Sequence, residues 1–239
     1  MADRYYCPEP PMNGWFALED DEARHLIRVR RVRVGEVVEV FDGRGFATRA
    51  EVVALGRDRV ELAAVGGPLA DRVAACRLTL ATAVPKGERF DWLVEKATEL
   101  GVTRLVPIMA ERSVVDPRAA KLDRLRRLVV EASKQCGRNR LMELDRPVPW
   151  VDFARQSDER PRLLAHPGGL PAPAWPRARR FGSVTLAVGP EGGFTDVEVE
   201  MARALGWTAI GIGATLLRIE TAGLAGCAAI LAHCEGTDE

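Results

Sequence analysis

The chain has 239 residues with 34 basic and 34 acidic side chains, so bulk charge does not indicate nucleic acid or a membrane as a partner. Its five cysteines form no C-x-x-C pair, which predicts reduced thiols rather than a disulfide framework. No signal peptide is recognisable, and no apolar run reaches the roughly 18 residues that a membrane span needs. We therefore expect a cytoplasmic protein without a membrane partner, long enough for one large or two small domains.

Short strands are predicted in the first part of the chain. They are rich in β-branched residues and cover residues 37–41, 46–55 and 58–65. Residues 42–45, Asp-Gly-Arg-Gly, have the composition of a hairpin turn. Two glycines and a proline at residues 66–68 end the pattern, because they do not continue a strand ladder. A compact β module is expected, with a domain boundary at about residue 70.

After this boundary, apolar runs of strand length alternate with segments of helical periodicity. The predicted strands are residues 77–84, 104–109, 162–165, 183–188 and 208–213. The predicted helices are about residues 90–100, 122–132, 196–205 and 220–234. This alternation predicts an α/β fold with a largely parallel sheet covered on both faces. The proline- and arginine-rich stretch 167–180 is predicted to be a loop.

Glycines follow one of these strands directly. Gly189, Glu191, Gly192 and Gly193 come after the run 183–188, and Thr195 with Glu198 has the spacing of a helix capping box. Ligands of open α/β sheets bind at the carboxyl ends of the strands, and glycine lets a ligand approach the backbone closely. The alternative is a tight strand-to-helix turn without a ligand.

A second glycine-rich segment follows the last predicted strand. Gly211 and Gly213 precede Leu216 and Leu217, and two such segments together favour a ligand pocket in the last third of the chain. The dinucleotide fingerprint is incomplete here, and no G-x-x-x-x-G-K-S/T motif occurs.

Arg218 and Glu220 come directly after this second segment. One interpretation is a structural ion pair that caps the last helix, because an acid near a helix N-terminus is favourable. The other is that the guanidinium stabilises negative charge that develops in a reaction at the pocket.

Two basic runs stand out in the neutral chain. The first contains five arginines and no acid: Arg24, Arg28, Arg30, Arg31 and Arg33. The second contains eight basic residues against two acids between residues 118 and 140, and it includes Arg118, Arg126 and Arg138. One such run is usually a solvated helix face, whereas two runs with the acids elsewhere indicate a surface for RNA phosphates.

Metal and nucleophile chemistry find little support. His25, His166 and His233 are far apart, and no cysteine and histidine spacing matches a known metal site, so no metal is expected. No G-x-S-x-G motif is present.

Six motifs together resemble the RsmE family, bacterial methyltransferases that modify uridine N3 in small-subunit (16S) ribosomal RNA and belong to the SPOUT superfamily. The motifs are RHLIRVRRVRVGEVVEVFDGRG (24–45), KGERFDWLVEKATELGV (86–102), ERSVV (111–115), EASKQCGR (131–138), LAVGPEGGF (186–194) and LLRIETA (216–222).

This resemblance implies a PUA-like β-barrel that holds RNA over residues 1–70 and a SPOUT methyltransferase domain over residues 71–239 with a C-terminal trefoil knot. It also implies a homodimer that takes part in ribosomal RNA processing, with S-adenosyl-L-methionine as cofactor. The substrate would be ribosomal RNA of the small subunit, either free or as an assembled particle.

The resemblance also assigns roles to residues. Donor-binding residues would be Gly189, Glu191, Gly192, Gly193, Gly211, Gly213, Leu216 and Leu217. Arg218 and Glu220 would be catalytic, and Gln135, Gly137 and Arg138 would lie near the substrate. Two residues depart from the family pattern, Ile219 where threonine is common and Ala214 where proline is common.

Two rival functions remain open at this point. A SPOUT ribose 2′-O-methyltransferase would carry an asparagine- and arginine-containing motif early in the domain, yet the only asparagines are Asn13 and Asn139. A non-catalytic RNA-binding protein would keep the β module and the basic residues but not the donor pocket.

Overall fold

The structure is a computed structural model that describes residues 3–9, 11, 13–115, 119–176 and 182–235. The chain divides into two compact units, which are described separately. The first comprises Met1–Val73 and Val130–Leu141, and the second comprises Ala74–Val129 and Met142–Glu239. The division falls inside helix α3 (Ala119–Cys136), so a segment distant in sequence joins the N-terminal residues.

The first unit is built on a five-stranded mixed sheet in the order β1-β3-β4-β5-β2. Its strands are β1 (Arg4–Tyr6), β2 (Trp15–Glu19), β3 (Val37–Phe41), β4 (Ala47–Leu55) and β5 (Arg59–Ala64). The pair β1 and β3 is parallel, and the other pairs are antiparallel. The edge strands β1 and β2 are not paired with each other in the described residues, so the expected barrel is a half-barrel. The three strands predicted in this region are confirmed.

The N-terminal elements of this unit were not predicted. Besides β1 and β2 they include helix α1 (Asp20–Arg24) and a π-helical turn, η1 (His25–Val29). Three to five residues are too few for a periodic pattern. Their apolar side chains nevertheless complete the core, where Tyr5, Leu18 and Leu26 are each 1 % exposed.

The second unit is built on a parallel sheet in the order β12-β10-β11-β6-β7-β8, with β9 also paired to β7. Its strands are β6 (Arg77–Ala83), β7 (Arg104–Met109), β8 (Glu143–Leu144), β9 (Val148–Pro149), β10 (Arg162–Leu170), β11 (Ser183–Val188) and β12 (Thr208–Ile210). The predicted parallel sheet is confirmed. Two boundaries differ, because β10 extends into the predicted loop and β12 ends before Gly211. Residues 177–180 of that predicted loop lie outside the described residues.

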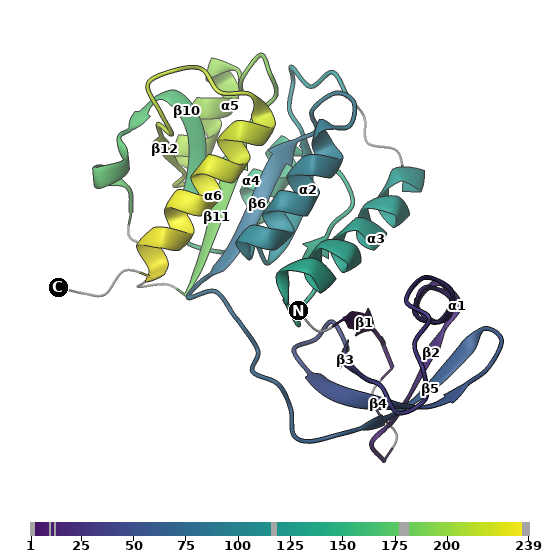
Figure 1. Ribbon diagram of the computed structural model, residues 1–239. Helices are drawn as coiled ribbons and strands as arrows, with labels where there is room; N and C mark the ends of the chain where they lie inside the picture. The colour runs from purple at the N-terminus through teal and green to yellow at the C-terminus, as the bar shows by residue number, and fades with distance from the viewer. Residues whose placement is uncertain (1–2, 10, 12, 116–118, 177–181, 236–239) are drawn as a thin grey trace. The chain divides into compact units, whose positions relative to one another are not determined.

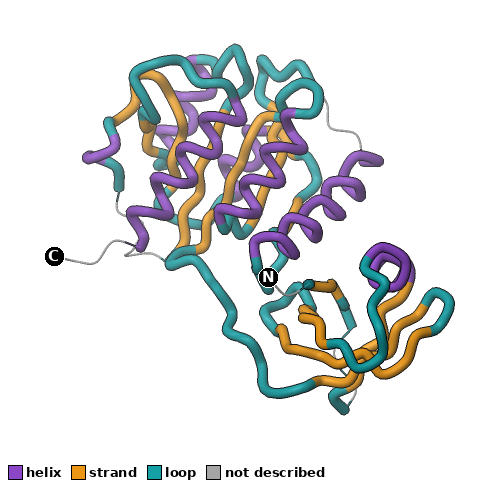
Figure 2. The backbone as a smooth tube through the Cα atoms, viewed as in Figure 1, coloured by secondary structure: helices purple, strands orange, loops and turns teal. Residues whose placement is uncertain are grey.

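Helices cover both faces of this sheet (Figures 1 and 2). They are α2 (Arg89–Leu100), α4 (Trp150–Gln156), α5 (Asp196–Ala204) and α6 (Ile219–Glu235), with a short 3-10 turn, η2 (Ala172–Ala174). Helices α2 and α6 pack side by side on one face, and α4 and α5 lie on the other. The predicted helices in this unit are confirmed, including Gly101 as the left-handed C-cap of α2.

Aromatic packing fixes the face of the sheet that α4 and α5 cover. The fully buried Trp150 ring lies 4.7 Å from the ring of Phe194 and 5.0 Å from that of Trp207, measured between centroids. These rings pack with Ala81, Val106 and Leu164 from the strands. Because Phe194 follows the first glycine segment directly, this core anchors one end of that segment.

One prediction about the cysteines is wrong. Cys76 and Cys234 are bonded as a disulfide, with 6.1 Å between their α-carbons and a sequence separation of 158. The fold brings the start of β6 and the end of α6 together, which cysteine spacing alone does not reveal. Cys7, Cys136 and Cys227 are free. Burial raises the pKa of the Cys227 thiol, which is consistent with a packing role.

Within the described part of the chain, none of the helices combines the length and the apolar character needed to cross a lipid bilayer.

We expect Gly169→Ala to destabilise the second unit. A Cβ at this position would overlap the backbone of Ile210, which cannot move aside as a flexible side chain can. Overpacking of this kind costs about 1–3 kcal/mol, which corresponds to a fall in Tm of roughly 3–10 °C. Thermal unfolding followed by circular dichroism measures it. The control is Gly213→Ala, because a Cβ at Gly213 meets no atom within 4 Å. Equal Tm values for the two variants would contradict this packing.

Candidate functional site

Both glycine segments lie at one edge of the second unit's sheet. Strand β11 ends at Val188 and β12 at Ile210, and both pair in parallel with β10, which lies between them. Carboxyl ends of parallel strands share an edge, and two interstrand spacings amount to about 10 Å. Residues 189–193 and 211–218 therefore begin on the same side of the sheet (Figure 1).

The first segment is a tight turn. The Gly193 N–H donates to the Pro190 carbonyl at 2.8 Å, and Gly193 has a φ of +68°. A Cβ at Gly189 would lie 2.9 Å from the Phe194 ring. The fold itself thus accounts for Gly189 and Gly193. The alternative of a turn without a ligand is sufficient to explain why these two positions are glycine.

A segment from elsewhere in the chain supports this turn. Arg112 donates from Nη1 to the Gly192 carbonyl at 2.7 Å, and the Glu111 N–H donates to Glu198 Oε1 at 2.9 Å. Glu198 also forms the predicted capping box with Thr195, which is confirmed. Residues 111–115 therefore hold the first glycine segment in place. The site predictions missed this role because it depends on contacts between residues about 80 positions apart.

Gly213 in the second segment differs from these glycines. Its backbone has no positive φ and a Cβ there would meet nothing within 4 Å, so neither strain nor packing in the described residues requires glycine. A glycine that neither packing nor backbone conformation requires is consistent with the close approach of a ligand to the backbone. Gly211, by contrast, is held by a hydrogen bond from its N–H to the Leu170 carbonyl at 2.8 Å.

A third segment joins this edge of the sheet. The pairing of β10 with β12 is irregular between Ala165 and Leu170, so residues 166–169 bulge there. The Gly168 N–H donates to His166 Nδ1 at 3.1 Å within this bulge. The sequence pattern placed most of these residues in a loop. Two adjacent glycines after a strand were the signal that could have identified them.

A cavity of about 540 Å³ adjoins the end of the second glycine segment. It is lined by Arg89, Trp92, Leu216, Leu217, Arg218, Glu220 and Thr221. Leu216 is 85 % exposed and Trp92 is 48 % exposed, so the walls of the cavity present apolar as well as charged groups. The structure therefore brings the predicted pair Arg218 and Glu220 into one cavity with two residues from α2.

The charged groups of this cavity do not pair as expected. Glu220 is 5 % exposed, and its Oε1 lies 3.6 Å from Nη1 of Arg89. Arg218 is exposed and forms no ion pair with any residue in the described ranges. An ion pair between Arg218 and Glu220 is therefore not what the structure contains. The Arg218 guanidinium is available to a ligand in the cavity.

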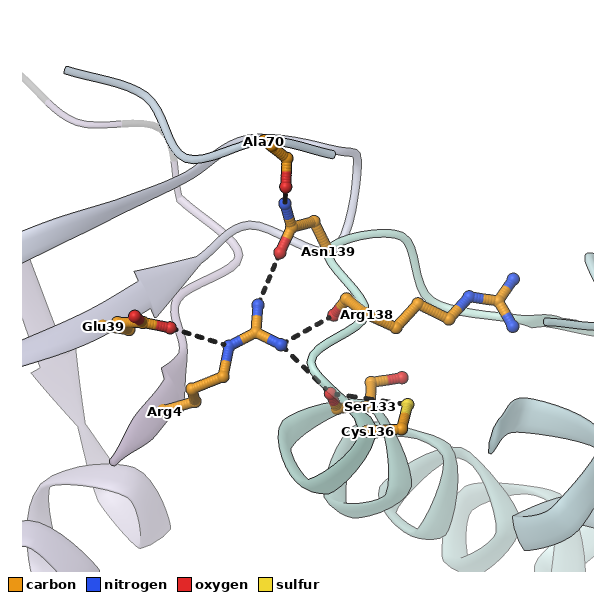
Figure 3. A network of polar contacts seen from close by, with 7 residues as sticks. All are labelled: Arg4, Glu39, Ala70, Ser133, Cys136, Arg138 and Asn139. Atoms are coloured by element: carbon orange, nitrogen blue, oxygen red, sulfur yellow. Dashed lines mark hydrogen bonds and ion pairs between the residues drawn. The ribbon is translucent and has the colours of Figure 1, made fainter. Parts of the chain in front are cut away.

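In the first unit, Arg4 organises the segment Gln-Cys-Gly-Arg at residues 135–138 (Figure 3). Arg4 is buried and donates from Nη1 to the carbonyls of Ser133 and Arg138, at 3.3 and 3.4 Å. It also donates to Asn139 Oδ1 and lies 3.5 Å from Glu39, and Asn139 donates to the Ala70 carbonyl. Burial lowers the pKa of Arg4, and the nearby Glu39 opposes this shift.

The side chain of Arg138 extends away from the Arg4 network (Figure 3). Burial also lowers the pKa of Arg138. Gln135 is exposed on the last turn of α3, and Gly137 ends the helix with a φ of +79°. The buried cation Arg4 thus fixes the backbone at Arg138, whereas the Arg138 guanidinium points away from Arg4.

The basic runs are less uniform than the sequence predicted. Acids both near and distant in sequence pair with these runs, so the expectation that acids lie elsewhere is wrong. Among the described residues the ion pairs are Arg24 with Asp21, Arg28 with Asp58, Arg30 with Asp3, Arg124 with Asp91, Arg126 with Asp123, Lys134 with Glu22 and Glu131, and Arg140 with Asp71. In the part of the chain that the structure describes, Arg31 and Arg33 are exposed and form no ion pair. Arg118 lies outside the described residues.

The described residues contain no group of three histidine, cysteine, aspartate or glutamate side chains that could hold a metal ion.

Comparison with known proteins gives two domain matches. Residues 72–231 match the RNA methyltransferase domain family, and residues 18–65 match the RNA methyltransferase PUA domain. A ribosomal RNA small subunit methyltransferase E from Synechocystis is 30 % identical over 231 residues, which cover 90 % of this chain and 72 % of the relative.

Solved structures agree with these matches. A ribosomal RNA small subunit methyltransferase E from Neisseria gonorrhoeae bound to S-adenosyl methionine is 32 % identical, with a TM-score of 0.89 over 97 % of this chain and 98 % of that one. A methyltransferase from Legionella pneumophila in complex with the same cofactor is 29 % identical, with the same TM-score and coverage. With its half-barrel and its parallel-sheet domain of SPOUT type, the chain belongs to the ribosomal RNA small subunit methyltransferase E family.

Proposed function

We propose that the protein transfers a methyl group from S-adenosyl-L-methionine to N3 of a uridine in small-subunit (16S) ribosomal RNA. The observation that carries the proposal is the placement of two glycine segments at one edge of the sheet, next to a cavity that holds Arg218 and Glu220. The relative from Neisseria gonorrhoeae, bound to S-adenosyl methionine, supports the cofactor.

The donor-binding residues are those at this edge. They are Gly189, Glu191, Gly192, Gly193, Gly211, Gly213, Leu216 and Leu217. The cofactor fits them because the backbone is bare at Gly213 without a structural reason and because Leu216 and Leu217 present exposed apolar side chains. When bound, the sulfonium supplies an electrophilic methyl group, and its sulfur retains the electron pair of the bond that breaks.

The protein's own groups then have two tasks. The uracil imide must lose its proton, and Glu220 is the carboxylate in the cavity that can accept it. Negative charge spreads onto the neighbouring carbonyl oxygens, where the guanidinium of Arg218, which has no ion-pair partner among the described residues, stabilises it. The cavity walls position the uracil so that N3 lies in line with the methyl group that is transferred.

We assign RNA binding to seven arginines and one glutamine. They are Arg24, Arg28, Arg30, Arg31, Arg33, Arg126, Arg138 and Gln135. We propose residues 1–70 as the RNA-binding domain and residues 71–239 as the catalytic domain. Exposed ion pairs such as Arg24 with Asp21 contribute little, about 0–1 kcal/mol, so phosphate groups can replace the acids.

The remaining family properties are also part of the proposal. They are a homodimer, a C-terminal trefoil knot, a cytoplasmic location and a small-subunit particle as substrate. The exposed Trp92, Leu216 and Leu217 support a homodimer, because large apolar side chains gathered around one cavity favour coverage by a partner.

We expect the purified protein to form N3-methyluridine in ribosomal RNA, and Arg218→Ala to lower kcat about 10²–10³-fold, as the loss of a donor to developing charge does. Mass spectrometry of nucleosides after incubation with labelled donor measures both. Calorimetric affinity for S-adenosylmethionine should remain within about twofold of the wild type, because Arg218 acts on the base.

Other products would change the assignment. A ribose-methylated nucleoside would indicate the 2′-O chemistry, and an absence of both product and donor binding would indicate a non-catalytic RNA-binding protein. Full activity in Arg218→Ala, with normal binding of donor and RNA, would show that Arg218 is not the stabilising cation.

We expect Gly213→Ala to weaken the affinity for S-adenosylmethionine about tenfold, or about 1.4 kcal/mol, because a Cβ there would occupy the space of the donor. The Tm should remain within about 1 °C of the wild type, since the added atom meets no protein group within 4 Å. Isothermal titration calorimetry measures the affinity. Unchanged binding would remove Gly213 from the donor site.

We expect Arg31→Ala and Arg33→Ala each to weaken RNA binding and to reduce the slope of log affinity against log salt concentration by about 0.7 in magnitude, which corresponds to one fewer phosphate contact. Fluorescence anisotropy with a labelled ribosomal RNA fragment at several salt concentrations measures this. Arg203→Ala is the matched control, because Arg203 pairs with Glu200 on the surface of α5. An identical slope for all three variants would place the RNA elsewhere.

A further inference from the structure

Glu220 is held asymmetrically at the start of α6. Its Oε1 lies 3.6 Å from Nη1 of Arg89, whereas its Oε2 is buried and has no hydrogen-bond partner among the described residues. The side chain is 7 % exposed. Because a buried carboxylate oxygen without a partner is costly, about 1–3 kcal/mol or more, this oxygen requires an explanation.

Arg89 is the first residue of α2 and approaches Glu220 from the neighbouring helix. Its Nε donates to the Lys86 carbonyl at 3.2 Å, so the guanidinium is held at one end by its own backbone turn and at the other by Glu220. Helices α2 and α6 pack side by side on one face of the sheet, as Figure 1 shows. The orientation of the carboxylate is therefore set by two packed helices and not by a loop.

Both residues line the cavity that contains Arg218. A bidentate ion pair would satisfy both carboxylate oxygens, because a guanidinium can bind each of them through one of its paired N–H groups. Only Oε1 is within ion-pair distance of Arg89 here, which leaves Oε2 for a donor that is not part of the described protein. The target base, with its imide N–H, supplies a donor of this kind.

We propose that Arg89 is a positioning residue for Glu220: it binds Oε1 and thereby orients the carboxylate so that Oε2, which is closed to solvent in this structure, accepts the N3 proton of the uracil base when the base enters the cavity and reaches it. This inference rests on the function proposed above. In the step, the N3–H bond breaks and an Oε2–H bond forms. The electron pair left on N3 forms the new bond to the donor's methyl carbon, and the sulfur takes the pair of the bond that breaks.

The same arrangement separates the roles of the two arginines. Arg89 is bound to Glu220 and acts through it, whereas Arg218 forms no ion pair in the described ranges and can contact the uracil oxygens directly. Substitution of Arg89 should therefore affect the rate of the chemical step and leave the binding of donor and RNA intact.

The experiment compares Arg89→Ala, Arg89→Lys and the control Arg203→Ala with the wild type, using full-length protein, ribosomal RNA and labelled donor. We expect Arg89→Ala to lower kcat about 30-fold, with KM for RNA and calorimetric affinity for S-adenosylmethionine within about twofold of the wild type. Arg89→Lys, which keeps the cation, should recover at least about a third of the wild-type kcat. Arg203→Ala should match the wild type.

A structural readout complements the rates. Crystal structures of the two Arg89 variants should show the Glu220 carboxylate displaced in Arg89→Ala and close to its present orientation in Arg89→Lys. The inference is overturned if Arg89→Ala keeps kcat within about twofold of the wild type, if Arg89→Lys is no better than Arg89→Ala, or if Glu220 does not move in Arg89→Ala. A wild-type protein that produces no N3-methyluridine would instead overturn the proposed function, and this inference with it.

Discussion

The parallel pairing of β10 with both β11 and β12 is the constraint on which the candidate site depends. It places the ends of β11 and β12 one strand apart at a single edge, so two segments separated in sequence begin beside each other. Gly169 makes the pairing with β12 possible, because any side chain there would overlap the backbone of Ile210. The site thus depends on a close contact between the backbones at Gly169 and Ile210, to which the side chains of the site do not contribute.

The glycines at this edge fall into two groups with different physical reasons. Gly169, Gly189 and Gly193 are required by packing or by backbone conformation, and a fold without a ligand would need them equally. Gly213 has no such requirement. The number of glycines in the sequence therefore overstates the evidence for a ligand. In the structure that evidence comes from Gly213, where neither packing nor backbone conformation explains the absence of a side chain.

Local chemistry explains what the sequence could predict. The strands of the parallel sheet, the capping box of Thr195 and Glu198 and the C-cap at Gly101 each depend on neighbouring residues, so their patterns are readable. The pair of Glu220 with Arg89, the contact of Arg112 with Gly192 and the disulfide of Cys76 with Cys234 join residues about 80 to 160 positions apart. No spacing rule reveals them, and they determine how the site is held.

Charged residues in the first unit differ between its surface and its interior. Arg24 and Arg28 pair with acids at exposed positions, where water and salt weaken the attraction and a phosphate can replace the carboxylate. Arg4 is different, because it is buried among the carbonyls of Ser133 and Arg138 and the side chains of Glu39 and Asn139. Removing one partner of a buried cation costs several kcal/mol, about 3–5, so this arginine is not available to RNA. In the proposed function, a chain with no net charge binds a polyanion through surface arginines whose ion pairs can exchange, while a fixed interior cation holds the segment that presents Arg138.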